Sequence, residues 1–426
     1  MADIKKLKDK INSGQFDKLL RELYADETCL SYQRKRYADA LEKYETLFGQ
    51  GEVSVFSAPG RTEIGGNHTD HQRGKVLAAA LNIDAIAIAG KNEEDVVQIV
   101  SGDASMITIS TKDLEANVSE EGTTTALVRG ILAGLKKKGY EAGGFKAYIT
   151  SDVLVGSGIS SSAAFEVLIG TIVSGLYHDM TIPPQELAKI GQHAENKYFG
   201  KPCGLMDQMA SAVGSLIYID FADTEEPLIQ STEFDFEQYG YVICITDTKS
   251  SHADCTAEYA AIPAEMKSVA KVFGKEVLNK VTKEELFANI APVREKAGDR
   301  AVLRAMHFMM ENERVELEVT ALKNGAFNEF LMLVKASGDS SFKYLQNVYN
   351  NEDVRHQNVS LALAVSETIL GAHGVCRVHG GGFAGTIQAF VPKDAVETYR
   401  KAMDNIYGVG ACKVYWVRKS GGVKVF

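Results

Sequence analysis

The chain has 426 residues, 45% apolar and 24% charged, and its 56 Asp and Glu outnumber its 46 Lys and Arg to give a formal net charge of −10. That length predicts two or three domains, and the composition is that of a globular protein with a core large enough to need no disulfide or metal cross-links. An acidic chain without a block of basic residues is a poor general binder of nucleic acids or anionic membranes, so we expect neither as a partner.

The sequence shows no sign of a targeting or membrane-spanning segment. Its opening, MADIKKLKDK, has no apolar core, and every apolar stretch is broken before the roughly 18 residues that a membrane helix needs. The six cysteines are scattered and form no C-x-x-C pair: Cys29, Cys203, Cys244, Cys255, Cys376 and Cys412. We therefore expect a cytoplasmic protein with reduced thiols and no zinc site.

In chain order, the first fifty residues predict two helices, because apolar residues recur there at helical spacing. Alternating or continuous apolar runs predict strands at 53–56, 76–89, 96–100, 107–109 and 144–150. Helical periodicity predicts helices at 123–138, from 163 onward, at 185–199 and at 206–213.

Beyond about residue 220 the pattern changes to long helices near 254–273, 300–323, 327–337 and 353–372, with strands at 239–246 and 414–417. Strands mixed with helices, without strict β-α alternation, predict an α+β protein of two lobes. We place the N-terminal domain at 1–220 and the C-terminal domain at 221–426.

The segment 156–163, GSGISSSA, lies between a predicted strand and a predicted helix. Glycines allow close backbone approach, and a helix N-terminus presents free N–H groups and its positive dipole end, so this is a candidate anion site. Its serines could also simply cap the helix. A Walker A sequence is absent, so a nucleotide site here is of another kind.

Residues 380–385, GGGFAG, match G-x-G-x-x-G formally. A strand, and not a helix, is predicted to follow, which excludes a dinucleotide-binding interpretation. The segment stands too near residue 426 for a protein-kinase catalytic lobe, and neither H-R-D nor D-F-G occurs. The alternative is a glycine-rich hairpin packed against another part of the backbone.

The segment 58–74, APGRTEIGGNHTDHQRG, concentrates polar side chains between two apolar strands: Arg61, Glu63, Asn67, His68, Asp70 and His71. Such a mixture of donors and acceptors is typical of a site for a polyhydroxylated ligand. A metal bound by the histidines and Asp70, or a merely solvated loop, are the alternatives.

Two carboxylates stand in apolar surroundings, Glu195 in GQHAENKYFG and Asp207 in PCGLMDQ. A carboxylate in such surroundings is usually paired in a salt bridge or caps a helix. The functional alternative is a catalytic base or a Mg²⁺ ligand.

Together, APGR…HTDH, VGSGISSSAA and HGGGFAGT resemble, in this order, the three signature motifs of the GHMP small-molecule kinases. Within that superfamily, HTD and CGLMDQ are similar to the galactokinase branch, and the resemblance runs from about residue 15 through the rest of the chain. It implies transfer of the ATP γ-phosphoryl group to the anomeric hydroxyl of galactose, with Mg²⁺. The partners would then be a small sugar and ATP, in a monomer or a weak homo-oligomer.

The resemblance also implies roles for individual residues. ATP phosphates would lie on Gly156, Ser157, Gly158, Ile159, Ser160, Ser161 and Ser162, and Mg²⁺ on Ser162 and Glu195. Asp207 would accept or orient the sugar's O1 proton, with Arg61 offsetting charge on the transferred group. The sugar would be bound by Asn67, His68, Thr69, Asp70, Gly204 and Tyr259.

Several positions depart from the motif G-R-x-N-L-I-G-E-H-T-D-Y that is usual in the family. This chain has Glu63 for Asn, Gly65 for an aliphatic residue, His71 for Tyr and, above all, Asn67 for Glu. An amide there removes a charged acceptor and adds a donor. Another sugar 1-kinase, acting on N-acetylgalactosamine, arabinose or a uronic acid, is therefore an alternative, and a catalytically silent sugar and ATP sensor is a further one.

Overall fold

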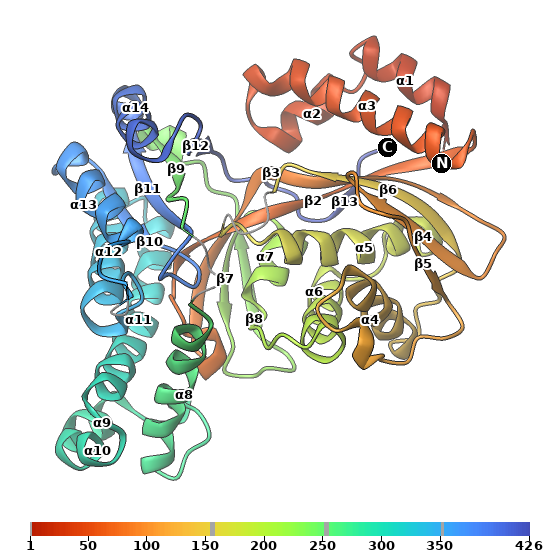
Figure 1. Ribbon diagram of the computed structural model, residues 1–426. Coiled ribbons are helices and arrows are strands. Elements are labelled where there is room, and N and C mark those ends of the chain that lie inside the picture. The colour runs from red at the N-terminus through yellow and green to blue at the C-terminus, as the bar shows by residue number, and fades with distance from the viewer. Residues whose placement is uncertain (1, 154–157, 251–254, 351–352) are drawn as a thin grey trace.

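The computed structural model describes residues 2–153, 158–250, 255–350 and 353–426. Two sheets with helices packed on them make up the molecule, as predicted for the α+β class (Figure 1). Gly156 and Ser157, which the resemblance places among the residues that bind the ATP phosphates, lie outside the described residues.

The larger sheet is built around two long antiparallel strands, β2 (Glu52–Gly65) and β3 (Lys75–Lys91). Its strand order continues from β1 (Ala2–Asp3) through β2 and β3 to β6 (Phe145–Ser151), β4 (Val96–Ser101) and β5 (Ile107–Ser110). The first half of β3 also pairs with β7 (Leu216–Asp220), which pairs with β8 (Leu228–Thr232). Finally β13 (Val423–Lys424) pairs with β2.

Helices cover both faces of this sheet (Figure 1). One face carries α1 (Ile4–Asn12), α2 (Asp17–Tyr24) and α3 (Leu30–Phe48), and the other carries α4 (Thr124–Lys137), α5 (Ser161–Tyr177), α6 (Pro184–Ala194) and α7 (Met206–Val213). This is why 76–89 is apolar on both sides: Ile86 and Ile88 pack toward α1–α3, whereas Ala85 and Ala87 pack toward α5. The prediction of two helices in the first fifty residues is wrong, because the chain turns at Gly14 and at Ala25, both with positive φ, and forms three.

The smaller sheet is antiparallel, in the order β10 (Val375–Val378), β11 (Thr386–Pro392), β9 (Tyr241–Asp247) and β12 (Cys412–Tyr415). The helices of this part of the chain are α8 (Thr256–Val272), α9 (Lys283–Ala288), α10 (Ile290–Ala297), α11 (Asp299–Lys323), α12 (Phe327–Ser340), α13 (Asn358–Leu370) and α14 (Val396–Tyr407). The long helices and both strands predicted there are confirmed, while the shorter α9, α10 and α14 were missed.

One apolar cluster joins the two parts, with Ile64 and Leu77 of the larger sheet packed with Ile243, Phe330 and Phe390. The large sheet also takes in β8 and β13, which follow residue 220 in the chain. The division at 220 and 221 stays a prediction. Ile64 of the segment 58–74 and Ile159 of the segment 156–163 belong to this cluster.

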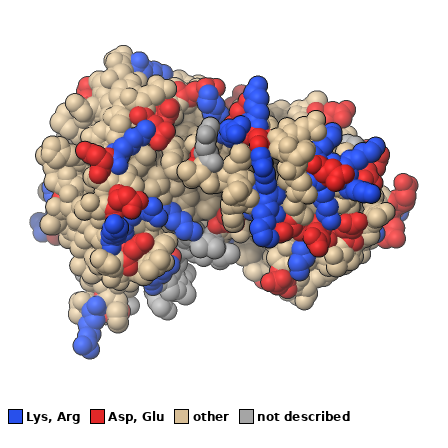
Figure 2. All heavy atoms as spheres, turned by 90° about the horizontal axis from the view of Figure 1, so that it is seen from above, with Lys and Arg blue, Asp and Glu red and all other residues tan. Residues whose placement is uncertain are grey.

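The surface carries charges of both signs. On the face seen in Figure 2, Lys and Arg are interspersed with Asp and Glu over both parts of the molecule. In the described ranges, no helix is both long and apolar enough to cross a membrane.

Candidate active site

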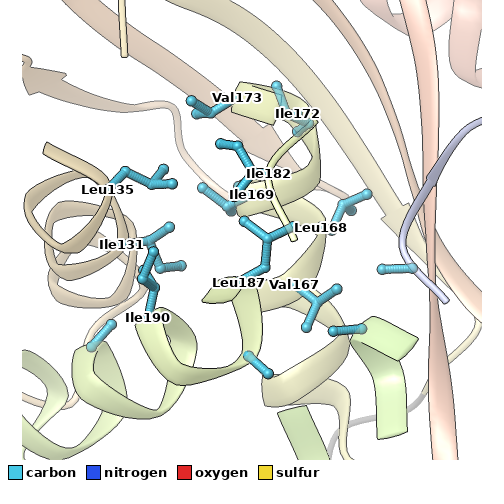
Figure 3. Packing of buried hydrophobic residues seen from close by; sticks show 14 of the residues in the cluster. Ile131, Leu135, Val167, Leu168, Ile169, Ile172, Val173, Ile182, Leu187 and Ile190 are labelled. Atoms are coloured by element: carbon cyan, nitrogen blue, oxygen red, sulfur yellow. The ribbon is translucent and has the colours of Figure 1, made fainter. Parts of the chain in front are cut away.

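The helix that follows the GSGISSSA segment is anchored rigidly. Apolar side chains surround α5, and Val167, Leu168 and Ile172 pack with Leu187 of α6 and Ile131 of α4 (Figure 3). Such burial fixes the position of the helix N-terminus, where backbone N–H groups and the positive end of the dipole favour an anion. The described part of the predicted phosphate segment, Gly158 to Ser162, leads into this N-terminus.

Ser160 does not cap the helix, although it stands at the N-cap position. Its φ of +58° is in the left-handed region, and no side-chain capping bond is formed. Its hydroxyl instead donates to Oδ2 of Asp207. The alternative of a merely Ser-capped helix is therefore wrong at this residue, and the segment is tied to the candidate catalytic carboxylate.

Arg61 and Asp207 form a two-point ion pair at the junction. Nε of Arg61 donates to Oδ1 of Asp207 at 2.6 Å and Nη2 to Oδ2 at 2.8 Å. Nη1 of the same guanidinium donates to the carbonyl of Gly158 at 2.7 Å. Arg61 therefore joins β2, α7 and the phosphate segment, in the planar geometry that suits an arginine and a carboxylate.

The surroundings of Asp207 keep it charged. Burial by itself raises the pKa of this carboxyl, but the Arg61 guanidinium and the Ser160 hydroxyl outweigh burial, and the pKa lies below its usual value. A third of the Asp207 side chain remains exposed (33%), so a ligand can reach it. An ionised, reachable carboxylate can accept a hydrogen bond from a substrate hydroxyl.

A second acidic group lies at the start of α5. Ser162 Oγ donates to Oε1 of Glu166 at 2.7 Å and lies 3.4 Å from Oε1 of Glu195. Gln208 bridges the two carboxyl groups, since its Nε2 is 3.0 Å from an oxygen of each. Lys201 Nζ adds an ion pair to Glu195 at 3.2 Å.

Glu195 begins a π-helical turn, Glu195–Phe199, that directly follows α6. The sequence predicted one helix across 185–199, so the change of winding at Glu195 is a correction to that prediction. Wide turns of this kind often re-aim a side chain at a functional site.

Asp70 and Gly204 lie against each other. A Cβ atom added at Gly204 would lie 1.6 Å from Oδ2 of Asp70, so only glycine leaves room for this carboxylate. Burial raises the pKa of Asp70, the neighbouring His68 lowers it and the charge of Asp207 raises it, with the net shift upward. His68 is kept neutral, since burial and His71 lower its pKa to about 4.

The glycine segment at 380–382 forms the turn between β10 and β11, so the predicted hairpin is confirmed. Four side chains hold its carbonyls, one of them Asn347, whose Nδ2 donates to Gly381 at 3.2 Å. Asn67 Nδ2 donates to Gly380 at 2.7 Å, His68 Nε2 lies 2.9 Å from the oxygen of Gly381, and the hydroxyl of Tyr259 on α8 donates to Gly382 at 2.6 Å. The turn thus lies against the residues predicted to bind the sugar.

Not all of those residues face an open site. Asn67 and Thr69 are fully buried. The hydroxyl of Thr69 is engaged with the carbonyls of Gly66, at 2.9 Å, and Lys75, at 2.6 Å. His68 and Asp70, by contrast, are only half-buried.

Sequence reasoning missed Glu166 and Gln208. Both lie on helices that were predicted, and a lone Glu in the apolar run AAFEVLIG was the same signal that drew attention to Glu195. Gln208 gave no such signal, because a glutamine next to Asp207 in the sequence does not by itself indicate a functional site.

Two family models match the chain within the described fold. The model "GHMP kinases N terminal domain" matches residues 126–215, which include α5 and α7, and "Galactokinase galactose-binding signature" matches residues 42–91, which include β2 and β3. The fold, the helix N-terminus and the Arg61–Asp207 pair together define a small-molecule kinase of the GHMP class.

Relatives extend the likeness over nearly the whole chain. A galactokinase of Actinobacillus pleuropneumoniae is 31% identical over 86% of this chain and 93% of its own length, and one of Streptomyces coelicolor is 28% identical over 90% and 97%. The chain belongs to the galactokinase family. Among solved structures, a Lactococcus lactis galactokinase complexed with galactose has a TM-score of 0.77 at 27% identity, covering 90% of this chain and 98% of its own. A Methanococcus jannaschii mevalonate kinase shares the fold, with a TM-score of 0.61 at 15% identity, over 86% of this chain and 99% of its own.

Proposed function

We propose that this chain transfers the γ-phosphoryl group of ATP to the anomeric hydroxyl of galactose and forms galactose 1-phosphate and ADP. The observation that carries the proposal is the Arg61–Asp207 pair: Asp207 accepts from Ser160 at the N-terminus of α5, and Arg61 belongs to the segment matched by the galactose-binding signature. A phosphate-binding helix end and a sugar-binding segment therefore meet at one charged carboxylate.

The phosphates of ATP would lie on the backbone N–H groups at the start of α5, with Ser161 and Ser162 in its first turn. This kind of binding depends on dipoles and donors and not on a basic patch, which suits an acidic chain. Arg61, held beside Asp207, would stabilise charge on the group in transfer.

Asp207 would accept a hydrogen bond from the O1 hydroxyl of the sugar and aim its oxygen at the γ-phosphorus. The new bond joins O1 to that phosphorus, and the bond from phosphorus to the oxygen bridging the β-phosphate breaks, so that ADP leaves with the electron pair. The O1 proton passes to Asp207 and then to solvent. Because the Asp207 pKa is lowered, we expect orientation of O1 to matter more than early removal of the proton.

Mg²⁺ is the cofactor that this site fits. Ser162 and Glu195 present two oxygens 3.4 Å apart, and Gln208 Oε1 is a buried oxygen without a hydrogen-bond partner among the described residues. The described residues hold no cluster of three or more His, Cys, Asp and Glu side chains arranged to bind a metal by themselves, so phosphate oxygens and water would complete the coordination, as is usual for Mg²⁺. Bound there, the ion would neutralise charge on the β- and γ-phosphates.

For the sugar, we propose contacts from His68, Asp70 and Tyr259, with Gly204 making room for Asp70. His68 and Tyr259 both contact the glycine turn. They supply donors and acceptors on more than one side, which recognition of several hydroxyls requires.

A coupled ADP-release assay with Mg·ATP tests the proposal on galactose, N-acetylgalactosamine, arabinose and galacturonic acid. We expect galactose to have the highest kcat/KM. Turnover of another sugar with none of galactose would overturn the assignment of the sugar, and no turnover of any would favour a silent sensor.

Asp207→Asn keeps the shape of the side chain and removes its charge. We expect kcat to fall by about 10²-fold or more, with ATP binding retained. Near-normal kcat in this variant would remove Asp207 from the mechanism. Asp39→Asn, an exposed substitution on α3, is the matched control.

A further inference from the structure

Asn67 uses the full hydrogen-bonding capacity of its side chain on the protein itself. Its Nδ2 donates to Oε1 of Glu63 at 2.9 Å and to the carbonyl of Gly380 at 2.7 Å. Its Oδ1 accepts from Nδ2 of Asn347 at 2.8 Å and from the hydroxyl of Ser341 at 3.2 Å. Two donors and two acceptors are all that an amide offers, and the orientation is fixed because Nδ2 faces only oxygens.

The residue is also out of reach of a ligand. Asn67 is 0% exposed, and its own carbonyl lies 2.9 Å from Nε2 of His307, which is fully buried. A sugar hydroxyl could bind the amide only by displacing one of its four partners, of which Glu63, Ser341 and Asn347 are buried and would then be left unsatisfied.

The partner of Asn67, Glu63, belongs to a buried ion pair with Arg377. Glu63 Oε1 accepts from Nη2 of Arg377 at 2.8 Å, at the same oxygen that receives Asn67. Arg377 belongs to β10, the strand that leads into the glycine turn, and its Nη1 donates to the carbonyl of Ile64 on β2. The pair therefore ties the strand of the sugar segment to the strand of the glycine turn.

The turn matters because it borders the reacting groups. A Cβ atom at Gly380 would lie 3.8 Å from Nη2 of Arg61, and one at Gly381 would lie 2.4 Å from the ring of Tyr259. A small displacement of the turn would therefore disturb Tyr259, His68 and the sugar space next to Asp207.

We propose that Asn67 is a positioning residue, which fixes the glycine turn Gly380–Gly382 against the sugar site through the Gly380 carbonyl and does not contact the sugar. This inference rests on the proposed function for its kinetic part. It makes Glu63, Asn67 and Arg377 one structural unit, and it leaves Asp70 and Asp207 as the carboxylates that face the sugar. The substitutions at 63 and 67 then act together and not as two separate departures from the family motif.

The first test is Asn67→Asp, which keeps the size of the side chain and the acceptor toward Asn347. It places a carboxylate oxygen where Nδ2 faced Glu63 and Gly380. We expect a lower melting temperature without sugar and a rise of about tenfold or more in KM for galactose, with KM for ATP unchanged. Asn328→Asp, on the exposed side of α12, is the control.

The second test adds Glu63→Gln to Asn67→Asp. The glutamine removes one of the two facing charges and supplies a donor, so the contact between positions 63 and 67 is restored, while the carbonyl of Gly380 still faces an acceptor. We expect the double variant to recover most of the melting temperature that Asn67→Asp loses, while its KM for galactose stays high. Recovery of both together would overturn the proposal, because a merely structural residue predicts that result.

The third test separates positioning from direct contact. We measure kcat/KM of the wild type and of Asn67→Asp for galactose and for its 2-, 3-, 4- and 6-deoxy forms. A positioning residue predicts the same fold-loss for every sugar. Disappearance of the loss with one deoxy sugar would show a contact with that hydroxyl and overturn the proposal.

The outcome for the proposed function can be read separately. If the wild type does not turn over galactose, the proposed function fails, and the role of Asn67 is then tested by the melting temperatures and by calorimetric binding of the same sugars to the same variants. An unchanged melting temperature in Asn67→Asp would itself overturn the role of Asn67.

Discussion

Arg61 determines the charge state of the carboxylate on which the chemistry depends. Because the guanidinium holds the pKa of Asp207 below its usual value of 3.8, Asp207 is ionised throughout the neutral range. Activity that needs the carboxylate is therefore present above that pKa and is lost only as the pH falls through it. The wild-type profile should show no loss from this group above about pH 5.

Arg61→Ala removes the positive charge that lowers the pKa of Asp207. Burial of this carboxyl, which raises its pKa, remains. We expect the acidic limb of kcat/KM for galactose to move upward by about one pH unit or more, in addition to a lower maximum. A pH profile from 4.5 to 8 measures this shift, with Arg294→Ala, an exposed arginine on α10, as control. An acidic limb that stays in place would show that Arg61 does not set the charge of Asp207.

Glu318 on α11 is a buried carboxyl with no hydrogen-bond partner on either oxygen among the described residues. It lies against Gly65, where a Cβ atom would be 2.0 Å from its Oε2. Burial, with Glu311 nearby, raises its pKa well above the usual 4.5. The small residue at 65 is thus explained by the carboxyl group that occupies the adjoining space.

A raised pKa makes stability depend on pH. The Glu318 carboxyl keeps its proton to a higher pH in the folded protein than in the unfolded chain. Its stabilising contribution to the free energy of unfolding is therefore complete below about pH 4.5. This contribution is lost as the pH rises toward the folded pKa, by up to about 1.4 kcal/mol per pH unit. Glu318→Gln should flatten the fall in the free energy of unfolding between pH 5.5 and 8, measured with urea. Equal slopes in the wild type and the variant would contradict this, and Glu329→Gln, which is exposed, should behave like the wild type.

At the scale of elements, Asp84 on β3 joins segments that are far apart in the chain. Arg36 of α3 donates to it at 2.7 Å, Tyr24 of α2 at 2.8 Å and Arg418, near β13, at 3.0 Å. Asp84 and Arg418 are fully buried. This carboxylate is shared by two guanidinium groups, of which Arg36 also pairs with Asp152 at 3.0 Å, and it holds the N-terminal helices to the sheet.

Asp84→Asn would leave the buried Arg418 without its counter-charge and Arg36 with Asp152 alone. We expect the free energy of unfolding to fall by about 3–5 kcal/mol, the usual cost of breaking a buried pair. Urea unfolding measures the loss, with Asp39→Asn as an exposed control. A change below about 1 kcal/mol would show that Asp84 is not needed to compensate these arginines.

The sequence predicted features that depend on residues close together in the chain better than features that depend on distant ones. Helix α7 was predicted with its observed bounds, because its signal is local apolar periodicity. The motifs located Arg61, Asp207, Ser162 and Glu195, and the structure brings these into two adjoining clusters. The bonds of Asn67 were not predicted, since they join segments far apart in the sequence. Glu166 was missed although its local signal, a lone Glu in an apolar run, was present, and the π turn was not predicted either.

At the scale of the whole molecule, β13 adds to the large sheet beside β2. β13 pairs with Ser57 and Phe56 of β2, the backbone bonds continue from Val425 to Val55, and the ring of Phe426 stacks on Phe16 at 3.8 Å. During synthesis on a ribosome, β2 is made early but gains this neighbour only after all three signature motifs have been translated. The sheet that carries Arg61 is therefore completed late. A nascent chain without β13 would contain the sugar segment in a sheet that still lacks this strand. Such an order delays formation of a competent phosphotransfer site until the chain can also supply the glycine turn.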